Sequence, residues 1–152
     1  MTPYAWVALS ACQDPAAGEL RTDLEGLSMR TQLPDSIVDV RWMTEVGQVG
    51  RSASGRADAR VYAWVTTTGP ADEWLTTTLG PAVGERLHRV KDTVADVLFT
   101  PELRKALVRD ERKKSWKLAC AKYPAHGIGK GEYRGDVVLA CDDHLYLALG
   151  AR

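Results

Sequence analysis

A four-residue identity between two distant segments constrains this chain more than any other sequence feature. Tyr4-Ala5-Trp6-Val7 recurs as Tyr62-Ala63-Trp64-Val65. After a slip of three residues a second match follows in the same order, in the pairs Pro15 and Pro70, Leu20 and Leu75, and Leu24 and Leu79. Each copy therefore predicts the same unit, an apolar strand that passes through a proline-marked turn into a helix.

The first copy has the local pattern that such a unit needs. Residues 4–11 form a short apolar run, which is typical of a strand buried on both faces. Asp14 and Pro15 suit the N-cap and the first position of a helix, which we predict over residues 15–29. Residues 37–43 place polar side chains at alternate positions and predict a second strand.

The second copy predicts a buried strand over residues 59–66 and a helix that opens at Gly69-Pro70. Gly80-Pro81 is expected to break or kink that helix. Residues 89–99 are rich in β-branched side chains and predict a strand, with a helix as the alternative. Two β-α-β halves predict an α+β fold of the ferredoxin-like βαββαβ type, with a four-stranded antiparallel sheet and both helices on one face.

Residues 101–152 are predicted to extend a ferredoxin-like domain formed by residues 1–100. Pro101 begins a short amphipathic helix, and residues 116–123 suggest a strand. After a glycine-rich loop, residues 136–149 predict a hairpin that turns at Asp142-Asp143. This extension has too few large apolar groups for its own core, so we expect it to pack on the domain or on a partner subunit.

The charge is balanced over the whole chain, with 20 Lys and Arg against 20 Asp and Glu. That balance excludes a strongly basic nucleic-acid packing protein. Residues 101–134 nevertheless carry ten basic and four acidic residues, a net charge of +6 that the rest of the chain offsets. This segregation favours a homodimer that joins opposite faces. The alternative is a single-stranded nucleic acid bound to the basic segment, where Trp116, Tyr123 and Tyr133 lie between the cations.

The number of cysteines indicates the cellular compartment of the protein. The chain has three, Cys12, Cys120 and Cys141. An odd and small number argues against a disulfide framework and predicts a cytoplasmic protein with inert, buried thiols. No apolar run approaches the roughly 20 residues that span a bilayer, so no membrane partner is expected.

No motif in the sequence defines a catalytic, metal or cofactor site. Neither a Cys-x2-Cys nor a His-x3-His spacing is present, so no metal and no cofactor are predicted. The glycine-rich segments 47–56 and 126–131 lack the spacing of a P-loop and are interpreted as flexible loops, with an anion nest as the alternative. His88 and His144 are left as the candidate catalytic residues.

Several segments together resemble a known family. The strand at 4–11, the helix at 15–29, and the segments 37–45, 58–65 and 89–93 resemble the ligand-binding domain of Lrp/AsnC-type regulators, within the dimeric α+β barrel proteins. No helix-turn-helix precedes the domain, and a longer loop at 47–57 replaces the expected tight turn. The resemblance implies a homodimer with sheets packed face to face. It also implies a small-molecule site at the loop after the second strand, formed by Thr44, Glu45, Gly47, Arg51, Arg56 and Asp58.

These expectations lead to a small-molecule-binding or regulatory homodimer without its own DNA-binding domain. The wider dimeric α+β barrel group also contains small oxidative enzymes, so the first alternative is a biosynthetic or oxidative enzyme with His88 or His144 as acid or base. Its cavity would be lined by Trp6, Trp42 and Trp64. The second alternative is binding of single-stranded nucleic acid through the basic segment.

Overall fold

The computed structural model describes residues 18–46 and 59–151. The described helices are short: α2 Leu24–Ser28, α3 Asp72–Leu79, α4 Asp92–Leu98, α5 Pro101–Ala106 and the 3-10 turn η1 His126–Ile128. The strands are β1 Ile37–Val46, β2 Ala59–Thr67, β3 Gly84–Lys91, β4 Val108–Asp110, β5 Ser115–Lys122, β6 Tyr133–Cys141 and β7 His144–Ala151. Strands therefore dominate the described part of the chain.

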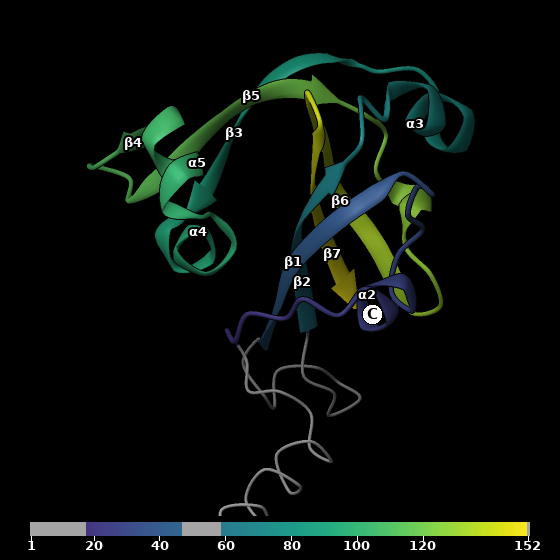
Figure 1. The fold of residues 1–152 in the computed structure, drawn as a ribbon, viewed down its shortest axis with the longest axis horizontal. Coiled ribbons are helices and arrows are strands. Elements are labelled where there is room, and N and C mark those ends of the chain that lie inside the picture. The colour runs from purple at the N-terminus through teal and green to yellow at the C-terminus, as the bar shows by residue number, and fades with distance from the viewer. Residues whose placement is uncertain (1–17, 47–58, 152) are drawn as a thin grey trace, which may run out of the picture.

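The seven strands form one antiparallel sheet in the order β1-β2-β7-β6-β5-β3, and β4 pairs with β5 beside this path. Strands β1, β2, β7 and β6 form its main part (Figure 1). The final strand of the chain, β7, lies between β2 and β6 in the middle of this part. The centre of the sheet is thus built from segments far apart in sequence, since the paired residues Val65 and Leu145, for example, are 80 positions apart.

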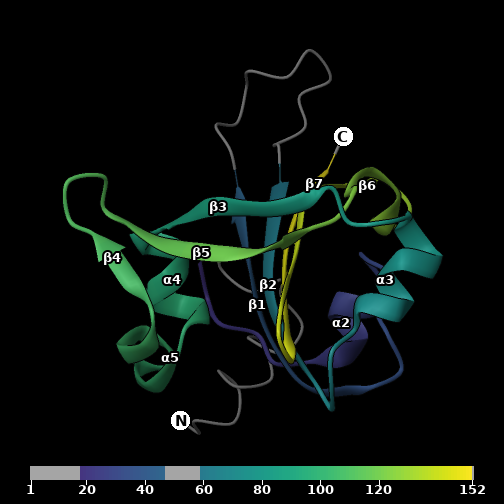
Figure 2. The same cartoon turned by 90° about the horizontal axis from the view of Figure 1, so that it is seen from above.

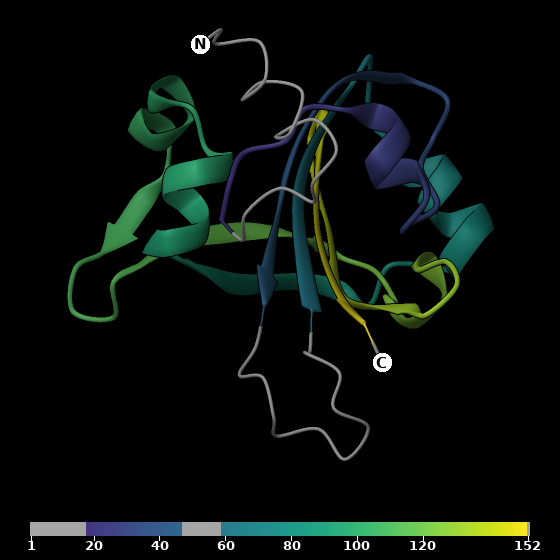
Figure 3. The ribbon, with the colours of Figure 1, turned by 90° about the horizontal axis from the view of Figure 1, so that it is seen from below.

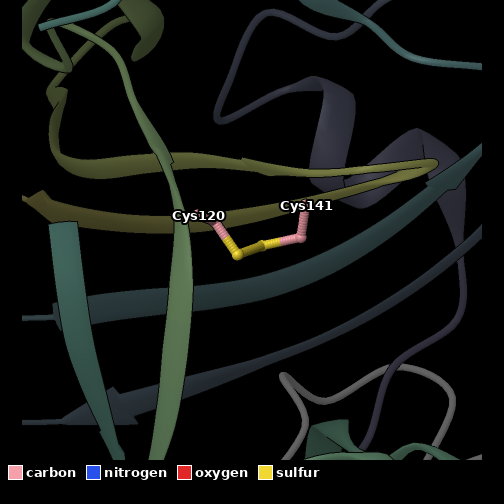
Figure 4. Close-up of a disulfide and its surroundings, with 2 residues drawn as sticks. All are labelled: Cys120 and Cys141. Atoms are coloured by element: carbon pink, nitrogen blue, oxygen red, sulfur yellow. A yellow bond between two sulfur atoms is a disulfide. The ribbon is translucent and has the colours of Figure 1, made fainter. Parts of the chain in front are cut away.

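Strands β3, β4 and β5 leave the main part of the sheet as a separate ribbon. Only two described residue pairs, Ala121 with Ala140 and Lys122 with Leu139, join β5 to β6. Beyond them β5 and β3 run across the other strands (Figure 2). The disulfide between Cys120 and Cys141 lies at the next position of the same register (Figure 4). It therefore fastens the ribbon to the main sheet at the point where the strands diverge.

Both faces of the main sheet are buried. On one face α2, α3 and η1 contribute Leu27, Leu75 and Ile128, which pack against Val61 and Leu147 of the central strands. On the other face α4 and the ribbon contribute Leu98 and Leu118, among others, against Trp64 and Tyr146. Figure 3 shows α2 and α3 on one side of the strands and α4 and α5 on the other. The molecule consequently has two apolar cores, one on each side of β2 and β7.

The predicted ferredoxin-like fold is wrong, and with it the assignment to the dimeric α+β barrel type. The sheet has seven strands rather than four, and helices lie on both of its faces. The hairpin β6–β7, expected in a peripheral extension, supplies the central strand β7. The physical reason is that β2 is buried on both faces, so its alternate side chains belong to two different cores. A sheet with helices on one face only would cover just one of these cores.

The predicted helices are shorter than expected because glycines interrupt them. In the described part of the segment 15–29, Gly18 has a φ of 87°, and helix α2 begins only after the N-cap Asp23. Helix α3 ends at Leu79 because Gly80 follows with a φ of 103°. Leu20 lies outside any helix and is 42% exposed, whereas its counterpart Leu75 is fully buried. Within the described residues, the second half of the first copy therefore does not form the structure of its counterpart.

Residues 89–99 are divided between two elements. Their first three residues complete β3, and Asp92–Leu98 form α4, which was the alternative interpretation. The strand predictions at 37–43, 59–66 and 116–123 are confirmed by β1, β2 and β5. The hairpin around Asp142-Asp143 is confirmed by β6 and β7. The predicted strand at 4–11 lies outside the described residues.

The cysteine prediction is wrong for two of the three residues. Cys120 and Cys141 form a disulfide between adjacent strands instead of remaining free thiols. Their separation of 21 residues in sequence gave no indication of pairing, because the register of β5 and β6 alone brings them together. No helix within 18–46 and 59–151 is long and apolar enough to cross a bilayer.

Candidate functional site

A cleft of about 380 Å³ opens between β3 and the face of the main sheet that the ribbon crosses. We call it the β3 cleft. Its lining combines charged, aromatic and aliphatic side chains from six elements: Glu45, Arg60, Tyr62, His88, Arg89, Val90, Lys91, Val94, Asp136, Val137, Tyr146 and Ala148. Concave sites of this size with a few polar groups among apolar ones are typical of small-molecule binding.

The floor of the β3 cleft follows from strand alternation. Arg60 and Tyr62 share one face of β2 because residues two apart in a strand point to the same side. The strand register then places Glu45 opposite Arg60 and Ala148 opposite Tyr62. The polar groups at this end of the sheet are thus fixed by backbone pairing rather than by a loop.

A β-bulge in β6 brings Asp136 into the cleft. The register with β7 shifts between Gly135 and Val137, so Asp136 is an extra residue without an opposite partner. Its carboxylate lies 3.5 Å from the Arg60 guanidinium. Gly150 leaves the necessary room, since a Cβ there would meet the Asp136 carboxylate at 3.3 Å.

His88 and Tyr146 lie together at the inner wall of the cleft. Their ring centroids are 5.4 Å apart, and Tyr146 is only 1% exposed. Burial, followed by the positive charge of Lys122, lowers the pKa of His88, so its imidazole is neutral at pH 7. Burial raises the pKa of Tyr146, and the nearby Tyr62 and Glu45 add to this effect. Among the described residues, neither ring forms a hydrogen bond.

The charged groups of the cleft are arranged in pairs. The Lys91 ammonium donates a hydrogen bond of 2.8 Å to the Glu45 carboxylate and lies 5.8 Å from the Tyr62 ring centroid. The bond to Glu45 is the main cause that raises the pKa of Lys91. Arg89 lines the cleft, but its guanidinium lies 3.7 Å from the carboxylate of Asp110, which does not line the cleft. The cleft therefore offers both charge signs around a neutral imidazole and a neutral phenol, which suits binding of a polar molecule better than proton transfer.

His144 belongs to a different cleft. Its ring stacks on Trp64 at a centroid distance of 5.0 Å, beside a hollow of about 530 Å³ on the opposite side of the ribbon, where β5 and α5 face the disulfide. The acidic residues at this disulfide cleft are Asp72, Glu85 and Asp142. The two histidines that sequence analysis had grouped as catalytic candidates therefore line different clefts.

The predicted ligand-binding residues are only partly assembled. Glu45 lines the β3 cleft, but Thr44 alternates with it along β1 and shares the face of Trp42, which packs in the other core. The other four residues predicted there lie outside the described residues: Gly47, Arg51, Arg56 and Asp58.

The expected tryptophan-lined cavity is not found among the described residues. Trp42 and Trp64 belong to the cores on opposite faces of the sheet, and Trp6 lies outside the described residues. Trp42 lies opposite Ala63, and the side chain of Ala63 points to the other face of β2 from that of its neighbour Trp64. The sheet therefore separates the two tryptophans.

Sequence analysis missed Asp136, Tyr146 and Lys91. Lys91 lay within the segment 89–99, which was predicted as a strand, and Asp136 at the start of the predicted hairpin over residues 136–149. The signal that could have revealed Asp136 is the pair Gly135 and Asp136 within an alternating strand, because a glycine there often marks a bulge. Tyr146 looks like any core residue of a buried strand, so no local signal distinguishes it.

Within the described ranges no three His, Cys, Asp or Glu side chains gather closely enough to hold a metal ion. Comparison with protein-family models, with curated proteins and with solved structures finds no match for this chain. Its function is therefore inferred from the geometry of the β3 cleft.

Proposed function

We propose that this protein binds a small polar or anionic molecule in the β3 cleft. One observation carries the proposal: the rings of Tyr146 and His88 lie 5.4 Å apart at the wall of the cleft, and no hydrogen bond within the described residues occupies the polar atoms of either ring. A bound ligand can therefore pair with both rings without breaking a hydrogen bond of the protein.

The surrounding groups narrow the chemistry of the ligand. The neutral imidazole of His88 can donate one hydrogen bond and accept another. Arg60 and Lys91 can each turn from a carboxylate partner to an anionic group of the ligand, because the partners Asp136 and Glu45 stay within reach on the same floor. A compact molecule with a carboxylate and a hydroxyl or amino group satisfies all of these groups.

Binding is tested by thermal shift with a library of polar and anionic metabolites, followed by calorimetric titration of the best compound. We expect Tyr146→Phe and His88→Gln to weaken binding about tenfold each, which corresponds to the loss of roughly 1.4 kcal/mol per hydrogen bond. His144→Gln is the matched control, because His144 faces the disulfide cleft. Unchanged affinity in both cleft variants, or a library without a hit, would contradict the proposal.

The two alternatives have less support. The oxidative-enzyme alternative depended on the dimeric α+β barrel fold, which the sheet topology overturns. For nucleic-acid binding, Tyr123 is 4% exposed and its hydroxyl donates to the Asp72 carboxylate at 3.0 Å, so its ring is not available to stack on a base. The homodimer stays a prediction, and sedimentation velocity over a range of concentrations tests it.

The predicted cytoplasmic location rested on the number of cysteines. The disulfide removes that support, because such bonds form and persist mainly in oxidising compartments. We therefore propose an oxidising environment instead. Mass spectrometry of protein alkylated directly in cell lysate tests this: Cys120 and Cys141 should escape alkylation until a reductant is added.

A further inference from the structure

Strand β5 has an unpaired stretch of backbone edge at the disulfide cleft. Along one edge it pairs with β3 over its whole length. Along the other edge, residues 115–117 pair with β4 and residues 121–122 pair with β6, and Figure 2 shows β4 beside one end of β5 and β6 towards the other. Between these pairings no described strand lies beside residues 118–120, which line the disulfide cleft.

Ala119 directs its backbone N–H and C=O to this open edge. The Asp92 N–H donates to the Lys114 carbonyl at 3.0 Å, and this pair continues the register of β3 and β5. Because bonded and non-bonded positions alternate in an antiparallel pair, Leu118 and Cys120 direct their backbone groups to β3, and Ala119 directs its own away from β3. Among the described residues no backbone group of β4, β6 or a neighbouring turn bonds to Ala119, which is exposed.

The indole N–H of Trp64 is a second polar group without a partner at this cleft. Trp64 lines the cleft although only 5% of the residue is exposed. Its ring contacts Phe99 and His144, but its N–H forms no hydrogen bond with any described residue. A ligand carbonyl can therefore accept from the indole without breaking a hydrogen bond of the protein.

The lining of the disulfide cleft carries negative charge. Its carboxylates are those of Asp72, Glu85 and Asp142, and no lysine or arginine is among the lining residues. None of the three carboxylates forms an ion pair within the described ranges. Asp72 accepts a hydrogen bond from the Tyr123 hydroxyl at 3.0 Å, which leaves its charge in place. A cation that enters the cleft is therefore attracted without displacing a cation of the protein.

The apolar part of the lining suits a long side chain with a charged end. Leu103 and Leu107 of α5 and Leu118 of β5 offer contact to an apolar stem near the carboxylates. Lysine and arginine combine such a stem with a cationic head. The free backbone groups of Ala119 favour a residue in amide linkage over a simple amine, because a peptide unit presents both an N–H and a C=O.

We propose that the disulfide cleft is a second binding site, which takes a lysine or arginine residue within an extended peptide. The N–H and C=O of that residue pair with those of Ala119 beside β5, and a neighbouring peptide carbonyl accepts from the Trp64 indole. The cationic head faces the carboxylates of Asp72, Glu85 and Asp142. This proposal goes beyond the small-molecule site and does not depend on it, since none of these residues lines the β3 cleft.

The test is a two-dimensional NMR titration of the disulfide-bonded protein with a blocked tripeptide that has lysine between alanines. We expect the largest shifts at the Ala119 amide and the Trp64 indole N–H. The lysine peptide should bind about tenfold more tightly than the same peptide with norleucine, and its affinity should fall as salt is raised. Equal binding of the norleucine peptide, or largest shifts at residues of the β3 cleft, would overturn the proposal.

Variants of the protein test the charge contacts. The double variant Glu85→Gln and Asp142→Asn should bind the lysine peptide about fivefold more weakly, a modest loss because both carboxylates are exposed. Asp39→Asn is the matched control, since Asp39 is an exposed carboxylate that lines neither cleft. If the double variant binds as tightly as this control, the carboxylates do not hold the cation and the proposal fails. Tyr146→Phe should leave peptide binding unchanged, which separates this result from the small-molecule site.

A change in the peptide tests the backbone contacts and does not depend on how any variant folds. The same tripeptide, methylated on the amide nitrogen of its lysine, should bind the unaltered protein about tenfold more weakly, because the donor to the Ala119 carbonyl is lost. Equal affinity of the methylated peptide would overturn the proposal. Binding of n-butylammonium as tight as that of the peptide would also overturn it, in favour of a site for simple amines.

Discussion

At the scale of single residues, polar side chains fasten the ribbon and helices to the main sheet. Arg41 of β1 is the clearest example: its guanidinium donates to the carbonyl oxygens of Leu98 at 2.7 Å and of Val97 at 3.0 Å. These carbonyls belong to the end of α4, where a helix leaves acceptors without an internal partner. Arg41 therefore connects the first strand of the sheet to the core beneath the ribbon.

We expect Arg41→Ala to lower the free energy of unfolding by about 1–3 kcal/mol, because two carbonyl acceptors lose a charged donor. Arg112→Ala is the matched control, since Arg112 is exposed and such substitutions usually change stability by less than about 0.5 kcal/mol. Urea denaturation measures both. If the two variants are equally stable, the hydrogen bonds of Arg41 contribute no more to stability than an exposed arginine does.

His88 makes stability depend on pH. Its pKa in the folded protein is below the unfolded value of about 6.5, so the unfolded chain binds the proton more readily. The stability contributed by the neutral ring is present above pH 6.5 and is lost as the pH falls towards the lower folded pKa. We expect the melting temperature of the unaltered protein to fall more between pH 7.5 and pH 5.5 than that of His88→Gln. A fall of the same size in both proteins would contradict the pKa direction.

At the scale of elements, the β-bulge in β6 depends on Gly135. A Cβ at this position would overlap the carbonyl oxygen of Ala125, in the segment that leads into η1. The backbone of β6 and the turn at η1 therefore approach each other more closely than any side chain allows. This approach also sets the position of Asp136, one residue further along the strand.

Gly135→Ala is expected to destabilise the protein by about 1–3 kcal/mol, as overpacking against rigid backbone does. It should also weaken ligand binding in the β3 cleft, because Asp136 moves with the bulge. Gly127→Ala provides the control, since its nearest contact would be a Leu79 methyl group at 3.9 Å. Thermal unfolding and ligand titration of the two variants check this prediction, which fails if Gly135→Ala behaves like Gly127→Ala.

At the scale of the whole molecule, the disulfide secures the junction between the two parts of the sheet. Only two residue pairs join β5 to β6 in the described chain, and Cys120–Cys141 adds a covalent restraint at this point. It closes a loop whose ends are 21 residues apart in sequence. For a loop of that length the chain-entropy model gives a stabilisation of about 3 kcal/mol.

Reduction of the disulfide, or the double substitution Cys120→Ala and Cys141→Ala, is expected to lower the free energy of unfolding by about 3 kcal/mol. Amide hydrogen exchange should accelerate most in β3 and β5, because their attachment to the main sheet weakens, and least in β2 and β7 at its centre. Uniform acceleration over all strands would show that the restraint is not local to the ribbon.

The sequence by itself determined most of the strands. Alternating and β-branched runs predicted β1, β2 and β5, and Asp142-Asp143 predicted the turn of the final hairpin. These features depend on side-chain period and turn chemistry, which are local. The sequence also placed Glu45 and His88 among the candidate site residues, although for reasons tied to a fold that the chain does not adopt.

Only the tertiary structure decided which strands are neighbours. The paired residues of β2 and β7 are 78 to 90 positions apart in sequence, His88 and Tyr146 are 58 apart, and Cys120 and Cys141 are 21 apart. No local pattern encodes such contacts, because strands of similar composition can pair in many orders. The order is selected by the requirement that both faces of β2 and β7 be buried, and that requirement also creates the cleft beneath β3.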